Sequence, residues 1–290
     1  MILITGANGQ LGACFAQIAQ ERGLQHVLLA NSTLLNITDK KAVRAFFEQY
    51  PAIEWCINCA AYTAVDKAET AAAAARKVNV DGARNLADIC AEKNVPLIHY
   101  STDYVYHSRQ NTPYKETDPV SPKGVYAKTK LAGERAALKA HPTGTMVIRT
   151  SWVYAAHGNN FVKTMLRLGA ERPALNVVFD QTGTPTFAPD LAAATLEIIE
   201  KITQNPALKA QMAGIWHYSN EGVTSWYDFA KAIMEIKQLP CAVQPIESSQ
   251  YPTPAQRPPF SVLNKAKIKN TFEIVIPHWR DSLKRCLEQL

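Results

Sequence analysis

Short apolar runs alternate with longer segments of helical periodicity along the first half of the chain. The apolar runs have the length of buried strands and lie at residues 1–5, 26–30, 54–59, 97–101 and 145–149. The segments between them have the spacing of helices and lie at residues 13–20, 39–50, 66–92 and 123–139. This alternation predicts an α/β fold with a doubly wound parallel (Rossmann) sheet.

After residue 149 the alternation loosens. Helix-like segments at residues 160–170, 190–202 and 225–237 and a strand-like run at 215–218 are separated by long turns. Because 290 residues exceed one ordinary domain, we expect a dinucleotide-binding domain over residues 1–152. Residues 153–290 are predicted to form mainly a smaller C-terminal α/β substrate-binding domain, with some segments returning to pack on the first domain.

Composition is that of a globular protein, with 47% hydrophobic residues and a mean hydropathy of −0.16. No apolar stretch approaches the roughly eighteen residues of a membrane span, and the first residues have the pattern of a core strand, not of a leader. We therefore expect a cytoplasmic protein without a membrane partner. The net charge of +6 is spread along the chain and suits an anionic substrate. Charge alone would also permit nucleic acid, but no recognised binding motif accompanies it, so we expect no nucleic-acid partner.

The six cysteines contain one close pair, Cys56 and Cys59, inside an apolar run. Residues three apart in a strand point to opposite faces, so a disulfide or a shared metal is geometrically difficult there. The pair is interpreted as structural, and no metal site is predicted.

Three glycines follow the first apolar run at intervals of three, and a helical segment follows them. Strand, glycine turn and helix is the order that a dinucleotide requires. Gly6 permits a tight turn, Gly9 lets the backbone approach a pyrophosphate, and Gly12 allows the helix and the strand to pack closely. The spacing is GxxGxxG, not GxGxxG, and it still predicts a dinucleotide site.

The acidic residue that usually holds the adenosine ribose, roughly twenty positions beyond the glycines, is missing. The second apolar run ends in Asn31 and Ser32, and no arginine for a 2′-phosphate stands there either. Lys40 and Lys41 are only distant candidates. The sequence therefore predicts NADPH or NADH as cofactor and leaves the choice between them open.

Tyr126 and Lys130 are four residues apart on a predicted helix, downstream of a strand that ends near Thr102. Residues at i and i+4 share a helix face, so phenol, ammonium and hydroxyl can meet in one cleft. A nearby cation lowers the pKa of a phenol, which would make Tyr126 a general acid. A solvated helix face would give the same spacing.

The proline-rich stretch at residues 248–259 is neither helix nor strand, and it is interpreted as a spacer or an ordered substrate loop. Arg257 lies within it. An arginine fixed among prolines can bind a phosphate with two hydrogen bonds, whereas a solvated loop arginine is the alternative.

Several blocks of the chain together resemble the extended short-chain dehydrogenase/reductases, and within them the dTDP-4-dehydrorhamnose reductases. The resemblance runs nearly end to end and is carried by residues 6–12, 59–69, 100–106, 126–134, 149–154, 180–186 and 257–258. It implies NAD(P)H-dependent reduction of the C4 ketone of dTDP-4-dehydro-β-L-rhamnose to dTDP-β-L-rhamnose.

The resemblance also implies residue roles. Tyr126 would protonate the developing alkoxide, Thr102 would hydrogen-bond the same oxygen, and Lys130 would bind the nicotinamide ribose. The residues implied at the substrate are Thr102, Asp103, Tyr126, Trp152 and Arg257. Those implied at the cofactor, besides Tyr126 and Lys130, are Gly6, Gly9, Gln10, Leu11, Gly12, Asn36, Ile37, Ala60, Ala61 and Tyr62. Alternatively, Trp152 is plain core and Thr102 a strand-end cap.

One departure from the family pattern concerns metal. Some members carry a glutamate just after the third glycine that helps bind magnesium at a dimer interface, whereas this chain has Ala13 and Cys14 there. A thiol is a poor magnesium ligand, so we expect metal-independent activity and a monomer or weak homodimer.

Three other interpretations remain open. An epimerase or dehydratase acting on nucleotide sugars shares the same residues but keeps its cofactor through the catalytic cycle. A non-catalytic regulatory subunit resembling that of methionine adenosyltransferase has the same architecture. A reductase of a related 4-keto sugar nucleotide would differ only in pocket details.

Overall fold

Six parallel strands form the central sheet of the computed structural model, which describes residues 1–108 and 110–290. The strands are β1 (Ile2–Thr5), β2 (Val27–Ala30), β3 (Trp55–Asn58), β4 (Leu97–Thr102), β5 (Thr145–Thr150) and β10 (Gly214–His217). Their spatial order is β2-β1-β3-β4-β5-β10, and every neighbouring pair is parallel. The order reverses between β1 and β3, and ligands of such sheets bind outside the strand ends at that point.

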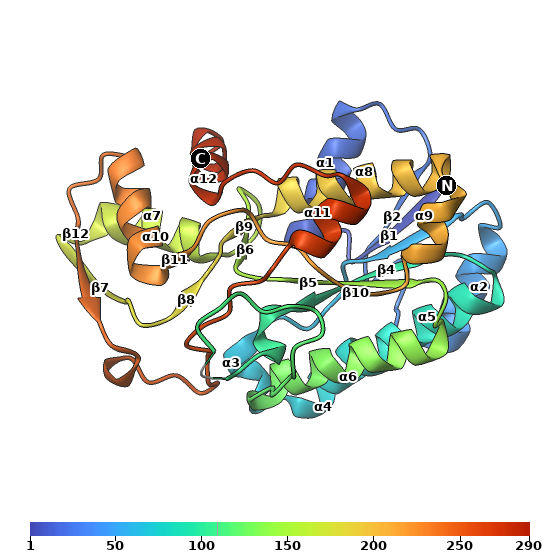
Figure 1. Ribbon diagram of the computed structural model, residues 1–290, viewed down its shortest axis with the longest axis horizontal. Coiled ribbons are helices and arrows are strands. Elements are labelled where there is room, and N and C mark those ends of the chain that lie inside the picture. The colour runs from blue at the N-terminus through green and yellow to red at the C-terminus, as the bar shows by residue number, and fades with distance from the viewer. Residues whose placement is uncertain (109) are drawn as a thin grey trace.

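Helices cover both faces of this sheet (Figure 1). One face carries α1 (Gln10–Glu21), α8 (Ala188–Gln204), α9 (Pro206–Gln211) and α11 (Ala266–Phe272), and the other carries α2 (Lys40–Gln49), α5 (Ala83–Glu92) and α6 (Gly124–Ala140). The predicted doubly wound α/β fold is confirmed.

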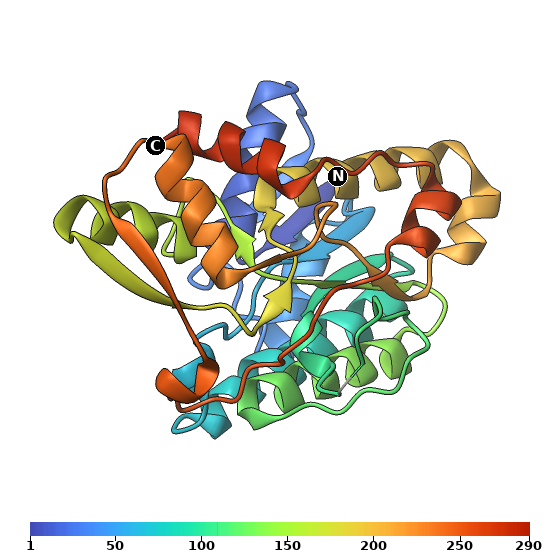
Figure 2. The ribbon, with the colours of Figure 1, turned by 60° about the vertical axis from the view of Figure 1, so that its left-hand side comes forward.

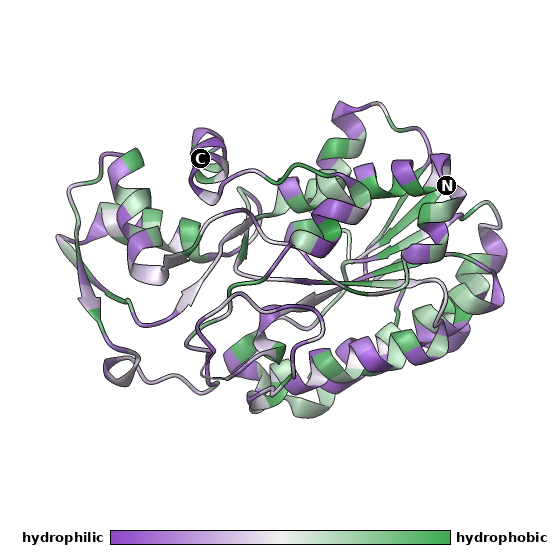
Figure 3. Ribbon diagram, in the orientation of Figure 1, coloured by the Kyte–Doolittle hydropathy of each residue, from purple (hydrophilic) through white to green (hydrophobic). Residues whose placement is uncertain are grey.

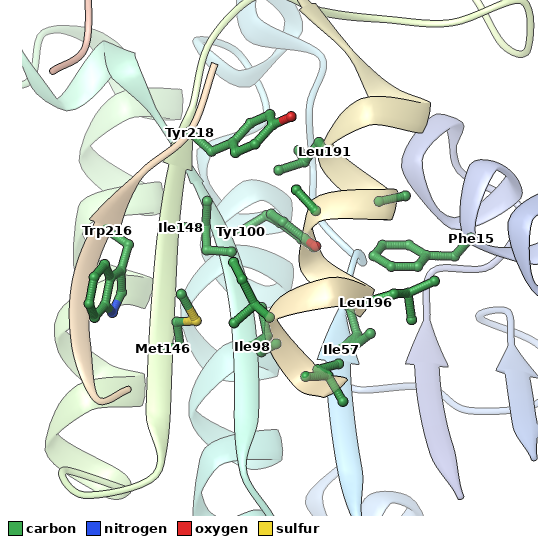
Figure 4. Close-up of a cluster of buried hydrophobic side chains, with 14 of the residues drawn as sticks. Phe15, Ile57, Ile98, Tyr100, Met146, Ile148, Leu191, Leu196, Trp216 and Tyr218 are labelled. Carbon is green, nitrogen blue, oxygen red and sulfur yellow. The ribbon is translucent and has the colours of Figure 1, made fainter. Parts of the chain in front are cut away.

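Neighbouring strand residues serve two different cores, because side chains alternate between the faces of a sheet. Ile57 packs with Phe15 of α1 and Leu196 of α8 in the cluster drawn in Figure 4. The preceding residue, Cys56, belongs to the core on the other face, whereas Cys59 packs beside the first cluster. The two cysteines of the close pair therefore lie on opposite sides, as predicted. In Figure 3 strand β1 is mostly green, as expected for a central strand that is buried along nearly its whole length.

The segments after β5 build a second group of elements beside the sheet (Figures 1 and 2). Three two-stranded ribbons pair β7 (Ala174–Val178) with β12 (Ala242–Ile246), β6 (Val153–Tyr154) with β9 (Thr186–Phe187), and β8 (Thr182–Gly183) with β11 (Thr224–Ser225). Helices α7 (Phe161–Glu171), α10 (Trp226–Ile236) and α12 (Trp279–Glu288) pack with them around Tyr154 and Phe229. The chain also returns from this region to the central sheet, through α8, β10 and α11. The domain division at residue 152 stays a prediction.

The segment predicted as one helix over residues 66–92 is broken. It contains α3 (Val65–Ala68), α4 (Ala72–Arg76), a π-helical turn η1 (Lys77–Gly82) and α5. Asn79 in η1 is buried, and its side chain accepts a hydrogen bond from the Tyr62 backbone N–H at 2.8 Å and donates to the Tyr62 carbonyl at 3.2 Å. The break therefore fixes the loop that follows β3, and π-turns of this kind are frequent at functional sites.

Among residues 1–108 and 110–290, no helix combines the length and the apolar character that crossing a membrane requires.

Candidate active site

The glycine turn between β1 and α1 leaves no room for side chains. Gly6 has φ of +66°, and a Cβ atom there would lie 2.6 Å from the Ala60 backbone nitrogen. A Cβ on Gly12 would lie 2.4 Å from the Gly6 carbonyl oxygen. No side chain caps α1, whose N-cap is Gly9, so its first backbone N–H groups remain available to an anion. The turn fits the pyrophosphate of a dinucleotide.

A cavity of about 440 Å³ opens beside this turn, at the carboxyl ends of the strands. Nine of the predicted site residues line it: Gly9, Gln10, Leu11, Ala61, Thr102, Asp103, Tyr126, Lys130 and Trp152. The structure thus brings the glycine turn and the predicted proton-transfer residues together in one space.

The other predicted cofactor residues do not line this cavity. Gly6, Gly12 and Ala60 form the close backbone contacts of the turn. Tyr62 is held by Asn79. Beyond β2, Asn36 is exposed and its side chain accepts hydrogen bonds from Thr38, whereas Ile37 is buried against Gly82. The assignment of Asn36 and Ile37 to the adenine therefore stays a prediction.

Helix α6 presents Tyr126 and Lys130 to the cavity, and two contacts fix its position. The carboxylate of Glu69 accepts a hydrogen bond from the Val125 backbone N–H at 2.7 Å, which replaces the cap that Lys123 does not supply. Gly133 packs so closely on η1 that a Cβ there would lie 2.0 Å from the Asn79 carbonyl oxygen.

The predicted effect of Lys130 on the phenol is wrong. Burial raises the pKa of Tyr126 to about 12, with a partial opposing effect from the Thr102 hydroxyl. The Lys130 ammonium instead donates a hydrogen bond to the Tyr100 carbonyl oxygen at 2.6 Å, and burial lowers the pKa of Lys130 to about 8. Spacing alone gave the helix face, but it did not reveal how strongly this site excludes water. These two shifts favour Tyr126 as a general acid, because Tyr126 keeps its proton at neutral pH while Lys130 remains mostly charged.

Thr102 ends β4 beside the phenol, and it does act as a cap. Its hydroxyl oxygen accepts a hydrogen bond from the Tyr104 backbone N–H at 3.2 Å, at the start of the short helix η2 (Asp103–Val105). The same hydroxyl donates to the Asp103 Oδ1 atom at 3.0 Å. Asp103 is only 1% exposed, and burial raises its pKa to about 7. The cap interpretation and the cavity position of Thr102 are therefore both correct.

A buried ion pair supports the strand ends behind the cavity. The carboxylate of Glu134, one turn after Lys130 on α6, accepts hydrogen bonds from Arg149 Nε at 3.0 Å and Nη2 at 2.7 Å, and also one from Ser101. Arg149 donates further to the Tyr106 hydroxyl at 2.6 Å. Because Ser101 precedes Thr102 in β4, this network holds α6, β4 and β5 in one register at the site.

Trp152 stands at the cavity wall in a conformation that is rare for bulky residues. Its φ is +47°, and its ring stacks on Trp226 with centroids 3.7 Å apart and 11° between the ring planes. Gly183 makes the space, because a Cβ there would lie 2.7 Å from the Trp152 ring. Sequence reasoning missed Trp226 and Phe161, which also line the cavity, because nothing in the local pattern separates them from core residues of α10 and α7.

Arg257 lies at a neighbouring cavity of about 850 Å³, whose wall shares Trp226, Phe161 and Tyr104 with the first cavity. Its Nη2 atom is 2.8 Å from Asp66 Oδ2, and Nη1 is 3.2 Å from Oδ1. Arg257 is thus not a solvated loop residue. It is fixed by a carboxylate from α3, which sequence reasoning did not connect with it.

The residues of the described chain, 1–108 and 110–290, contain no group of three or more histidine, cysteine or acidic side chains placed to hold a metal ion. Burial raises the pKa of Cys14 to about 12, so this residue is a neutral thiol and not a thiolate ligand. Metal-independent activity stays a prediction.

Comparison with known proteins gives consistent matches over the whole chain. A protein named dTDP-4-dehydrorhamnose reductase from Aggregatibacter actinomycetemcomitans is 41% identical, with 98% of this chain and 97% of that protein aligned. A solved dTDP-4-dehydrorhamnose reductase from Clostridium acetobutylicum has 37% identity and a TM-score of 0.91, covering 99% of this chain and 98% of that one. The reductase from Bacillus anthracis, solved in complex with NADP, has 34% identity and a TM-score of 0.91 and covers 100% and 99%.

The family model described as the RmlD substrate binding domain matches residues 1–290. With relatives at this identity over nearly the full length, the resemblance inferred from the motifs is confirmed. The chain belongs to the RmlD family, the family of the dTDP-4-dehydrorhamnose reductases.

Proposed function

We propose that this protein reduces the C4 ketone of dTDP-4-dehydro-β-L-rhamnose to dTDP-β-L-rhamnose, with NADPH or NADH as the hydride donor. Family membership supports the reaction class and the substrate. The single observation that carries the chemistry is the convergence of Tyr126, Lys130 and Thr102 on the cavity beside the glycine turn.

The site residues would hold the cofactor in two places. The N–H groups at the start of α1, next to Gly9, would bind the pyrophosphate, and Lys130 would bind the nicotinamide ribose. A bound nicotinamide supplies the hydride. An uncapped helix end and a turn without room for side chains are the features of this chain that fit a dinucleotide.

Tyr126 would supply the proton. Hydride addition to a ketone leaves negative charge on its oxygen, and a phenol with a pKa near 12 still carries its proton when that charge develops. Thr102 would donate a hydrogen bond to the same oxygen. After each turnover Tyr126 regains a proton.

The aromatic wall and the second cavity would receive the rest of the substrate. Trp152, fixed by stacking on Trp226, would flank the sugar. Arg257 would face the diphosphate with the guanidinium that Asp66 now orients, and Asp103 would lie beside the sugar. These roles are proposals that rest on the positions of the side chains along the two joined cavities.

The test is to incubate the protein with dTDP-4-dehydrorhamnose generated in situ and to follow NADPH and NADH absorbance in separate reactions. We expect oxidation of at least one cofactor in proportion to the dTDP-rhamnose formed. Tyr126→Phe should lose this activity, whereas Tyr50→Phe, at the C-terminal end of α2 and outside both cavities, should retain it.

Two outcomes would replace the proposal. Conversion of the substrate without any added nicotinamide would indicate an epimerase or dehydratase that recycles its cofactor. Tight binding of a partner enzyme without ketone reduction would favour a regulatory subunit. Cytoplasmic location and a monomeric or weakly dimeric state accompany the proposal as predictions, to be checked by fractionation and by light scattering.

A further inference from the structure

The hydroxyl of Thr102 can donate only one hydrogen bond, and Asp103 and a ligand oxygen would compete for it. In the structure it donates to Asp103 Oδ1 at 3.0 Å and accepts from the Tyr104 backbone N–H at 3.2 Å. A hydroxyl donates one hydrogen bond and accepts two. While the proton points to Asp103, it cannot be given to a ligand oxygen in the cavity.

Asp103 is an unusual partner, because it is buried without a cation. The other two fully buried carboxylates of the described chain are paired, Glu134 with Arg149 and Asp190 with Arg285. Within the described part of the chain, the Oδ2 atom of Asp103 has no hydrogen-bond partner at all. An ionised carboxylate in such a position is costly, and protonation removes most of the cost.

We propose that Asp103 is a positioning residue whose protonation state sets the direction of the Thr102 hydroxyl. This inference rests on the proposed ketone reduction. When Asp103 is protonated, its own O–H donates to the Thr102 oxygen, which then accepts from both Asp103 and the Tyr104 N–H. The Thr102 proton is released to the cavity, where the ketone oxygen would lie. When Asp103 is ionised, the carboxylate holds that proton and the ketone loses a donor.

Of the titratable groups that surround Asp103, all but one keep the same protonation state near neutral pH. Burial raises the pKa values of Tyr104, on η2, and Tyr126, on α6, far above neutrality. Arg257 and Asp66 lie beyond Tyr104 and form their own ion pair. The exception is Lys130 on α6, whose pKa is lowered to about 8.

Ser261 also faces Asp103, and its hydroxyl does not titrate in this range. Two groups therefore control the alkaline side of the activity profile, Asp103 first and Lys130 after it.

The experiment is the pH dependence of kcat/KM for ketone reduction, with Asp103→Asn as the variant. For the wild type we expect a one-proton fall with its midpoint near pH 7, because burial raises the pKa of Asp103 to about 7, so that about a tenth of the plateau remains one pH unit above the midpoint. An asparagine does not titrate. The variant profile should stay level up to the limb set by Lys130, near pH 8. Asp81→Asn, at an exposed carboxylate paired only with Arg84, should keep the wild-type profile.

A second variant covers the case in which Asp103→Asn loses its fold, which cofactor titration and thermal unfolding would reveal. Thr102→Val removes the hydroxyl through which Asp103 acts, so its residual activity should show no fall near pH 7. An unchanged neutral fall in either folded variant would overturn the inference while leaving the reductase proposal intact. A wild type that does not reduce the substrate at any pH would instead refute the proposed function, and the inference with it.

Discussion

Replacing Glu134 by glutamine removes the charge from a carboxylate that is sealed behind the active site. Glu134 is 1% exposed and Arg149 is 4% exposed, so the guanidinium cannot regain water when its partner is neutralised. It would keep only the hydrogen bond to Tyr106 and a weaker one to the new amide. Breaking one side of a buried pair costs about 3–5 kcal/mol, and because glutamine retains an acceptor we expect about 3 kcal/mol.

For a protein of this size such a loss lowers the midpoint of thermal unfolding by roughly 5 °C. Urea denaturation and calorimetry measure the two quantities independently. The matched control is Glu171→Gln, because the Arg167–Glu171 pair is more than half exposed at both ends and should contribute about 0–1 kcal/mol.

A double variant sharpens the test. Adding Arg149→Met to Glu134→Gln removes the stranded charge, so it should recover part of the lost stability. A loss below about 1 kcal/mol for Glu134→Gln alone would refute the reasoning, since it would mean that water reaches Arg149. Further destabilisation by the second substitution would refute it as well.

The remaining predictions concern the two cavities and the glycine turn. Tyr126→Phe should lower turnover by about two to four powers of ten with nearly unchanged cofactor affinity, and near-normal turnover would remove the phenol from the mechanism. Gly12→Ala should weaken NADPH binding at least about tenfold because its Cβ meets the Gly6 carbonyl, as measured by fluorescence titration, whereas Gly23→Ala, with open space around it, should not. Arg257→Ala should raise KM for the nucleotide sugar by about ten- to a hundredfold with a smaller change in kcat; an unchanged KM would place the diphosphate elsewhere. Exhaustive chelation with EDTA should leave turnover unchanged, and a strict magnesium requirement would contradict the metal-independent site.

Short sequence patterns predicted those parts of the site whose residues lie close together in the chain. The glycine turn needs only the strand before it and the helix after it, and Tyr126 and Lys130 share a face wherever their helix packs. Burial is different, because it depends on everything that packs around the helix. This is why the sequence indicated a phenol with a lowered pKa, whereas the closed environment of Tyr126 raises it.

Contacts between distant parts of the chain account for the other omissions. Arg257 and Asp66 are 191 positions apart, and Glu69 reaches Val125 across 56 positions, so no window of sequence contains either pair. The π-turn at Asn79 interrupts a run with good helix-forming composition, and only its contacts with Tyr62 and α6 explain it. Trp226 was assigned to a helix correctly, but its pairing with Trp152 depends on two separate segments.

The place of β10 in the sheet has a consequence for synthesis on the ribosome and for protein engineering. Residues 1–152 supply five strands, yet β5 keeps an open edge until β10 has emerged, and the apolar face in Figure 4 is covered only in part, by α1, until α8 arrives. Residues 1–152 are consequently not a module that can be cut out and grafted onto another protein. A chimaera that exchanges cofactor preference between relatives must carry α8, β10 and α11 along with the first 152 residues. Otherwise the unpaired edge of β5 is exposed, and we expect the chimaera to aggregate.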